Sequence, residues 1–235
     1  MPGAIVDISP RLSARTAVFP GDVPLSRKVM FDMKRGDALT LSALASTVHL
    51  GAHADAPSHY ARDGVTIDQQ PLELYWGVCE VVRVRAGVVV AAKGAAAAGA
   101  TREVSMSRRV GRADLDVSER WVPSAPRVLI ATGSHPNADE WRSDFLALEP
   151  SFVDWLADAG VRLVGIDTPS VDCADSKELP SHARFAARGV AILEGLVLAG
   201  VESGEWELCA MPLRLEGFDA SPVRAVLRRD QSAGR

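Results

Sequence analysis

Three of the chain's five histidines lie in one short stretch that reads HLGAHADAPSHY. His49, His53 and His59 share it with Asp55, and all four positions have odd numbers. In an extended chain, residues two positions apart point to the same face, so these four side chains would point the same way. A helix would turn Asp55 to the far side, and the glycine and proline inside the stretch also oppose a helix. The stretch therefore predicts an extended or looped segment whose polar side chains converge.

The side chains of this stretch are typical of a metal site. Imidazole nitrogen and carboxylate oxygen suit zinc, and also manganese or iron. A single histidine is usually structural, but three histidines and an aspartate within eleven positions favour metal binding. The alternative is a run of hydrogen-bonded core residues or an incidental surface cluster. Cys79, Cys173 and Cys209 form no Cys-x-x-Cys pair, so we do not expect cysteine ligands.

Length and composition place these residues in an ordinary globular protein. The chain has 235 residues, of which 47% are hydrophobic and 24% charged, which fits one large domain or two small ones. The net charge of -4 gives no reason to expect a nucleic-acid partner. Charges interrupt the most apolar tract, and the N-terminus lacks a signal-peptide pattern, so we expect no membrane association. The three widely spaced cysteines indicate a reducing compartment, and we expect the cytoplasm.

Apolar runs predict the elements that would position the cluster. Continuous or valine-rich runs predict β-strands at 4–8, 77–84, 127–133, 161–167, 190–198 and 206–215. Residues 39–50 alternate loosely between apolar and small or polar side chains. Helical spacing predicts helices from Pro150 to Gly160, over 181–189 and as a closing turn within 221–229. Many strands with few helices indicate a single α/β domain over residues 1–235, built on a mixed β-sheet core.

Residues 91–120 differ in character from the rest of the chain. They are first small, then charged, and show no sustained apolar face. Glycines at positions 94 and 99 weaken the helical tendency of the alanine run. We therefore expect a surface insertion over 91–120 that is dispensable for the chemistry.

The motif HLGAHADAPSH resembles the His-x-Gly-Thr-His-x-Asp-x-Pro-x-His signature of the cyclase-like metal-dependent hydrolases. Within that family the chain is similar to the bacterial kynurenine formamidases (arylformamidases). The stretches DISP, FPGD, DTPSVDCADSKELPSH, AILEGLVLAGV and FDASPVRAVL carry the same likeness in the same order, over nearly the whole chain except 91–120. Two positions depart from the pattern. Ala52 stands where the family usually has Thr, and Phe19 stands where the formamidases have Trp.

The resemblance implies a fold and a ligand set. The fold would be the family's swivelling β/β/α type. His49, His53 and Asp55 would hold a first metal ion, and Asp55 would bridge to a second ion that His182 and Glu194 also hold. The implied cofactor is two divalent ions per chain, zinc in first place, with manganese or iron as alternatives. Glu194 also draws attention by itself, because a carboxylate inside the apolar run VAILEGLVL needs a metal or an arginine partner.

The resemblance also implies roles for the remaining residues. His59 would be the acid/base catalyst, since an imidazole titrates near neutral pH. Phe19 would bind the substrate's aromatic ring, with an aromatic surface but without the indole N–H of Trp. His135 is expected in a loop near the mouth of the pocket, and a turn role is the default for Asp172 and Asp175.

The implied reaction is the hydrolysis of N-formyl-L-kynurenine to L-kynurenine and formate, a step of tryptophan degradation. The two ions would activate water and stabilise the oxyanion of the reacting amide. A hydrolase of a related small amide such as isatin is the alternative within the family. A metal-binding protein without catalysis is the alternative of another class. The resemblance further implies a homodimer acting on a small molecule.

Overall fold

The computed structural model describes residues 3–88 and 109–229. The β-strands are β1 (Ile5–Asp7), β2 (Ser26–Phe31), β3 (Leu41–Ala45), β4 (His53–Asp55), β5 (Trp76–Arg83), β6 (Arg109–Val110), β7 (Arg127–Ala131), β8 (Ala147–Leu148), β9 (Leu163–Ile166), β10 (Ala191–Glu194), β11 (Gly204–Cys209), β12 (Ala220–Pro222) and β13 (Val226–Arg228). The α-helices that lie wholly within the described residues are α3 (Pro150–Asp158) and α4 (Pro180–Arg188). Short 3-10 turns cover Met33–Arg35, Pro57–His59, Ile67–Gln69, Leu72–Leu74 and Arg112–Asp114.

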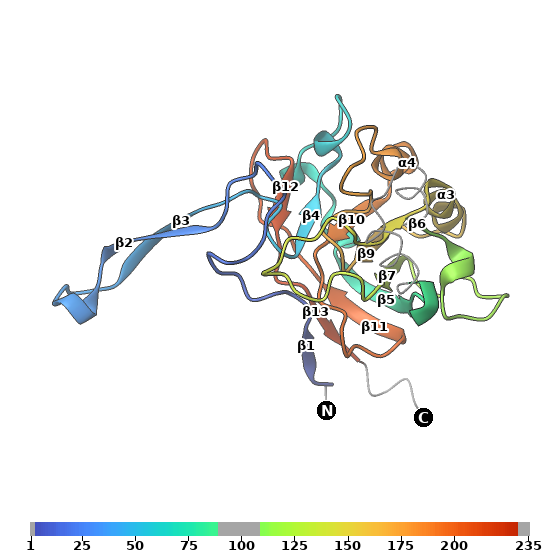
Figure 1. The fold of residues 1–235 in the computed structure, drawn as a ribbon, viewed down its shortest axis with the longest axis horizontal. Coiled ribbons are helices and arrows are strands. Elements are labelled where there is room, and N and C mark those ends of the chain that lie inside the picture. The colour runs from blue at the N-terminus through green and yellow to red at the C-terminus, as the bar shows by residue number, and fades with distance from the viewer. Residues whose placement is uncertain (1–2, 89–108, 230–235) are drawn as a thin grey trace.

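A nine-stranded mixed sheet forms the centre of the fold, in the order β1-β13-β11-β5-β7-β9-β10-β4-β12. Its four middle strands β5, β7, β9 and β10 run parallel, and the outer pairings are antiparallel. Figure 1 shows α3 and α4 side by side against this sheet. The architecture confirms the prediction of an α/β domain with a mixed sheet and few helices.

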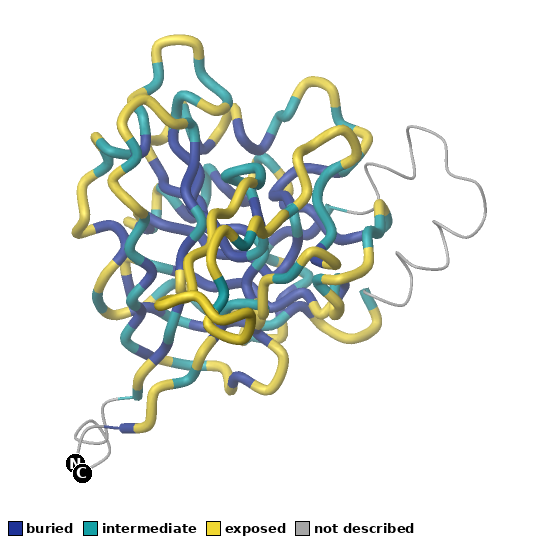
Figure 2. Tube along the Cα trace, turned by 90° about the vertical axis from the view of Figure 1, so that its left-hand side faces the viewer, coloured by how far each residue is buried: buried dark blue, intermediate teal, exposed yellow. Residues whose placement is uncertain are grey.

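Side chains alternate between two hydrophobic cores along the middle strands. Val82 and Ile130 face the core that α3 and α4 cover, whereas their neighbours Val81 and Leu129 face the opposite core. The alternation follows from the two-residue period of a strand. Buried residues accordingly concentrate along the central strands in Figure 2.

The sheet curls around the second of these cores. Ala54 of β4 lies in the same buried cluster as Leu208 of β11 and Leu227 of β13, although these strands are far apart in the sheet order. The curl brings the ends of several strands toward one another. The candidate site described below depends on this convergence of strand ends.

The two α-helices begin and end where the sequence indicates. Each has a proline in its first turn, at Pro150 and Pro180, where the missing N–H is not needed. Gly160 and Gly189 follow the helices with positive φ angles of 87° and 62°, a conformation that glycine adopts without strain. The predictions of these two helices are confirmed.

The prediction of a C-terminal helical turn is wrong. Residues 221–229 instead contribute to β12 and form β13. Val223, Ala225 and Leu227 are all buried, so this segment follows a period of two and not a helical period. Its strands complete the sheet at two separate places, beside β4 and beside β11.

The expected insertion at 91–120 falls in two parts. Residues 91–108 lie outside the described residues. For residues 109–120 the prediction of a surface segment is wrong, because Val110 and Leu115 are buried in the core beneath α3. β6 also pairs with β8 in a separate two-stranded sheet. Because small and charged side chains surround Val110 and Leu115 in the sequence, the pattern did not indicate that these two apolar residues are buried.

The remaining two strands, β2 and β3, form a hairpin that projects away from the rest of the molecule (Figure 1). Loose alternation at 39–50 hints at β3, but nothing in the sequence analysis pointed to β2. In the part of the chain that the structure describes, no helix is long and apolar enough to cross a membrane.

Candidate active site and metal centre

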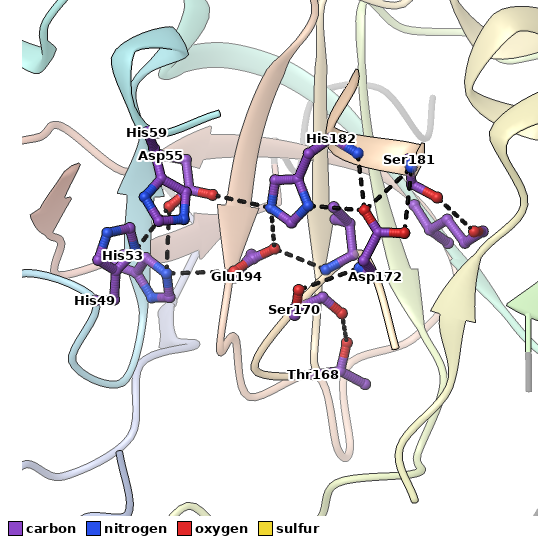
Figure 3. A network of polar contacts seen from close by, with 12 residues as sticks. His49, His53, Asp55, His59, Thr168, Ser170, Asp172, Ser181, His182 and Glu194 are labelled. Atoms are coloured by element: carbon purple, nitrogen blue, oxygen red, sulfur yellow. Dashed lines mark hydrogen bonds and ion pairs between the residues drawn. The ribbon is translucent and has the colours of Figure 1, made fainter. Parts of the chain in front are cut away.

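Strand pairing and helix packing bring the predicted ligands together. β4 carries His53 and Asp55, and its register with β10 sets His53 directly opposite Glu194. His182 comes from the first turn of α4, and His49 from the loop before β4. Figure 3 shows these side chains pointing toward one another from separate elements.

Gly195 allows this close approach. Gly195 follows Glu194 with a φ of 65°, and a Cβ there would lie only 2.1 Å from the carbonyl oxygen of Gly51. A larger residue would push β10 away from the loop that carries His49. The spacing between Glu194 and the histidines therefore depends on Gly195.

Asp55 is the centre of the cluster. Its Oδ1 lies 3.1 Å from Nδ1 of His49 and 3.4 Å from Nε2 of His53, and its Oδ2 lies 3.5 Å from Nε2 of His182. Glu194 approaches the same two Nε2 atoms, at 3.4 Å from His53 and 3.5 Å from His182. All of these residues except His49 are almost fully buried.

The orientation of His53 fits a metal ion. Its Nδ1 donates to the carbonyl oxygen of Gly51 at 2.8 Å, so Nε2 faces Asp55 and Glu194 and is the nitrogen that would offer a lone pair to a metal ion. Among the described residues, His53 Nε2 and both carboxylate oxygens of Asp55 are buried without a hydrogen-bond partner. Buried acceptors that face one another are costly unless a cation lies between them.

The electrostatics of the cluster also favour a cation. Burial opposes protonation of His53, but Asp55 and Glu194 outweigh it and raise the pKa of His53 to about 10. Burial opposes ionisation of Asp55, but the neighbouring imidazoles of His182, His49 and His53 hold the pKa of Asp55 well below its usual value. Burial and the charge of Asp55 oppose ionisation of Glu194, yet His182 and His53 lower its pKa. Two ionised carboxylates with imidazole nitrogens form a donor set that fits a divalent ion such as zinc, manganese or iron.

The structure brings together the six residues predicted to bind metal or transfer a proton, and two candidate ligand groups lie among them. Ligand atoms of His53, Asp55 and Glu194 lie within 4.8 Å of one another, and so do those of His49, Asp55 and His59. Asp55 belongs to both groups, as a bridging carboxylate would. How the other ligands divide between ions stays a prediction.

His59 contacts a carboxylate that the sequence analysis missed. Asp219 Oδ2 lies 3.3 Å from Nδ1 of His59 and 3.0 Å from Nε2 of His49, and the two rings are 4.1 Å apart. Burial opposes ionisation of Asp219, but the hydrogen bond with His49 lowers its pKa. Asp219 directly precedes β12, whose Ala220 pairs with Asp55. Its place in the motif FDASP was the available signal, but only this non-local pairing gives it a role.

Asp172 lies in a loop, as expected, but its side chain is buried and contacts a predicted metal ligand, a role beyond the turn role expected for it. Its Oδ2 accepts from Nδ1 of His182 at 2.9 Å and from the His182 backbone N–H at 3.0 Å. Its Oδ1 lies 2.8 Å from Nη1 of Arg109. Burial opposes ionisation of Asp172, but His182 and then Arg109 lower its pKa to about 2. Asp172 thereby orients Nε2 of His182 toward Asp55 and Glu194.

The cluster forms one wall of a cavity of about 710 Å³. Phe19 lines this cavity, as expected, and its ring meets the ring of Trp141 edge-on at 4.5 Å between centroids. Trp141 therefore brings an indole beside the position where Phe19 replaces Trp. His135, which was expected in a loop near the mouth of the pocket, lines the same cavity.

Comparisons with known proteins agree with this fold. One match is a structure titled "The Structure Of Potential Metal-Dependent Hydrolase With Cyclase Activity", at 25% identity over 97% of this chain and 98% of the other, with a TM-score of 0.72. A predicted metal-dependent hydrolase from Bacillus stearothermophilus matches at 25% identity over 96% and 98%, with a TM-score of 0.70. Isatin hydrolase A from Labrenzia aggregata shares the fold at 21% identity over 96% and 93%, with a TM-score of 0.68.

The family model Cyclase, described as "Putative cyclase", matches residues 6–173. This range holds the histidine stretch, β5, β7, β9 and α3, and it ends within the loop between β9 and α4. The match covers well over half of the chain. The chain therefore belongs to the Cyclase family.

Proposed function

We propose that this protein is a metal-dependent arylformamidase that hydrolyses N-formyl-L-kynurenine to L-kynurenine and formate. The observation that carries the proposal is the buried cluster around Asp55 in the wall of a cavity that also has an aromatic side. Two structures of similar fold carry the titles of a potential and a predicted metal-dependent hydrolase, which supports the reaction class. The motifs shared with the formamidases support the choice of substrate.

The residues of the cluster would divide the chemistry between them. His49, His53, Asp55, His182 and Glu194 would hold two divalent ions, zinc in first place. Such ions make water more acidic and stabilise negative charge on a carbonyl oxygen.

In the reaction the water oxygen bonds to the formyl carbon, and the bond between that carbon and the arylamine nitrogen breaks. His59 would carry the proton from water to the departing nitrogen. Asp219 would hold the His59 ring in place through Nδ1.

The cavity suits a flat amine product. Its volume of about 710 Å³ lies within the usual range for small-molecule sites. Phe19 and Trp141 offer an edge-to-face pair against which an aryl ring packs. The formyl group is small enough to approach the buried cluster.

Turnover by the purified, metal-loaded protein tests the proposal directly. N-formylkynurenine and isatin should be offered side by side, because an isatin hydrolase shares this fold. We expect faster hydrolysis of N-formylkynurenine. Preference for isatin would support the alternative hydrolase, and turnover of neither substrate with metal still bound would indicate a metal-binding protein.

The proposed metal site leads to a separate prediction about the metal content of the protein. Protein purified without chelator should contain about two divalent ions per chain, because Asp55 offers both of its oxygens to different ligand groups. Elemental analysis measures the number and identity of the ions. Undiminished turnover in strong chelator, from protein without metal, would contradict both the cofactor and the mechanism.

The aromatic rings of Phe19 and Trp141 in the cavity lead to a prediction about substrate affinity. Phe19→Ala removes a ring that lines the cavity, so KM for an arylformamide should rise by an amount equivalent to about 1–3 kcal/mol. Phe19→Trp keeps the ring and is the matched control, with KM near that of the unmodified protein. Unchanged KM and kcat in Phe19→Ala would show that Phe19 does not contact the substrate.

A further inference from the structure

The cavity beside the metal cluster contains one positive and one negative side chain that the proposed reaction does not use. Arg83 and Asp167 both line this cavity. Among the described residues of the lining, Arg83 is the one arginine or lysine. Asp167 belongs to neither of the two ligand groups that share Asp55. Both side chains are therefore available to bind a part of the substrate away from the reacting bond.

The sheet places these two residues on the same side of neighbouring strands. Arg83 is the last residue of β5 and Asp167 directly follows β9, with β7 between them. Val81 and Leu163 face the core inside the curled sheet, so the two-residue period of a strand directs Arg83 and Asp167 to that side as well. The three strands run parallel, so both residues lie at carboxyl ends, where α/β sheets bind ligands.

Gly133 leaves open space between the two strand ends. It follows β7 and lines the cavity, and a Cβ added to it would meet no atom within 4 Å. Arg83 is opposite Ala131, two residues before Gly133, in the register of β5 and β7. Asp167 accepts from the Gly133 backbone N–H at 2.9 Å. The space at Gly133 is therefore flanked by a guanidinium on one side and a carboxylate on the other.

The Arg83 guanidinium has hydrogen-bond donors to spare. Its Nη2 donates to the carbonyl oxygens of Leu198, at 3.3 Å, and of Val201. In the part of the chain that the structure describes, its Nε and Nη1 make no hydrogen bond and no carboxylate pairs with it. A guanidinium has five N–H donors and binds carboxylates through two of them at once. Arg83 is thus suited to an anionic group of a bound molecule.

The Asp167 carboxylate is held in a fixed orientation. Its Oδ1 accepts from the backbone N–H and the hydroxyl of Thr132, at 2.9 and 2.6 Å, and its Oδ2 accepts from Gly133. Burial raises the pKa of Asp167, while these hydrogen bonds act against the rise because they favour the carboxylate. A carboxylate oxygen can accept two hydrogen bonds, so Oδ2 can accept another from a cationic group in the cavity.

We propose that Arg83 and Asp167 form a subsite for an α-amino acid group, in which Arg83 binds the α-carboxylate and Asp167 binds the α-ammonium. The inference rests on the proposed function, because N-formyl-L-kynurenine carries this group at the end farthest from its formyl group. Isatin has no such group. The subsite would therefore select amino-acid arylformamides over isatin.

The order of the strands agrees with an extended substrate. β9 is next to β10, which ends at Glu194, and β5 is two strands further along the sheet. Neighbouring strands are about 4.8 Å apart, so the end of β9 lies about 5 Å and the end of β5 about 14 Å from the end of β10. A substrate with its formyl carbon at the metal cluster would reach Asp167 first, and the long Arg83 side chain extends back toward it.

Three arylformamides with different tails test the subsite in the purified, metal-loaded protein. N-formyl-L-kynurenine has both charged groups, 4-(2-formamidophenyl)-4-oxobutanoate lacks only the ammonium, and 2-formamidoacetophenone lacks both. We expect kcat/KM to fall by about 10–100-fold with each group removed, mainly through KM, because each loses a hydrogen bond between charged groups. The substrate without the ammonium tests Asp167 without disturbing the hydrogen bonds that Asp167 makes to the backbone.

Arg83→Gln separates substrate binding from a structural role. Glutamine keeps an N–H donor for the carbonyls of Leu198 and Val201 but has no charge. KM for N-formyl-L-kynurenine should rise by about 10–100-fold, and the preference over 2-formamidoacetophenone should fall by the same factor. Arg85→Gln is the matched control, because Arg85 is exposed, lies outside the cavity lining and contacts the carbonyl oxygen of Ala113.

Calorimetric binding of the product gives a readout without turnover. L-kynurenine should bind about 10–100-fold more weakly to Arg83→Gln than to the unmodified protein, whereas 2-aminoacetophenone should bind both equally. Equal kcat/KM for the three formamides, or an equal loss on all three in Arg83→Gln, would overturn the subsite and leave the proposed function standing. Hydrolysis of none of them would overturn the proposed function and this inference with it.

Discussion

His59→Ala should keep its fold and its metal ions yet lose roughly 10²–10⁴-fold in kcat, which is the usual effect of removing a positioned acid/base. The contacts of the His59 side chain explain why we expect the metal ions to stay bound. His59 is the most exposed histidine of the cluster and its Nδ1 contacts Asp219, whereas the buried ligands converge on Asp55. Removing the His59 imidazole therefore leaves the central donor set intact. Single-turnover rates and elemental analysis of the same preparation measure both quantities.

His53→Ala is the matched comparison. Nε2 of His53 lies between Asp55 and Glu194, so its removal should cost metal first and activity as a consequence. His59→Ala protein that emerges from purification without metal would make His59 a ligand, as its grouping with His49 and Asp55 allows. His59→Ala protein with full turnover would make it a bystander.

The sequence correctly predicted that the polar side chains of residues 49–59 converge. The extended chain that was expected to align them covers only part of this stretch. Only His53 to Asp55 is a strand, and there the alternation holds. His49 lies beyond a turn at Gly51, where φ is 59°, and His59 lies at the end of a 3-10 turn. These two join the cluster through backbone turns that residue parity does not describe.

Residues that act through distant partners could not be found from local patterns. Asp219 and Asp172 look like ordinary loop acids, and their roles come from pairing between β12 and β4 and from the packing of α4. Arg109 sits 63 positions from Asp172 in a segment without an apolar pattern. The order of the strands likewise depends on long-range pairing, which local periodicity does not contain.

Asp172→Ala should be the most damaging change outside the ligands themselves. Arg109 would keep its charge in a nearly closed environment without its carboxylate partner, which should lower the free energy of unfolding by about 3–5 kcal/mol. His182 would lose the acceptor that fixes its ring, which should weaken metal binding by about 10–100-fold. Asp154→Ala, which breaks surface ion pairs between α3 and α4, is the control and should cost about 1 kcal/mol or less. Denaturant unfolding and metal titration measure the two effects.

A double variant separates these two effects. Arg109→Met in the Asp172→Ala background removes the unpaired charge and keeps an apolar side chain of similar length, so much of the lost stability should return. Metal affinity should stay low, because Nδ1 of His182 still has no carboxylate to hold its ring and keep Nε2 directed at Asp55 and Glu194. Recovery of stability and metal affinity together would show that Asp172 only balances the charge of Arg109. Recovery of stability alone would show that Asp172 positions the ligand, and that the segment at Arg109 stabilises the carboxylate that does so.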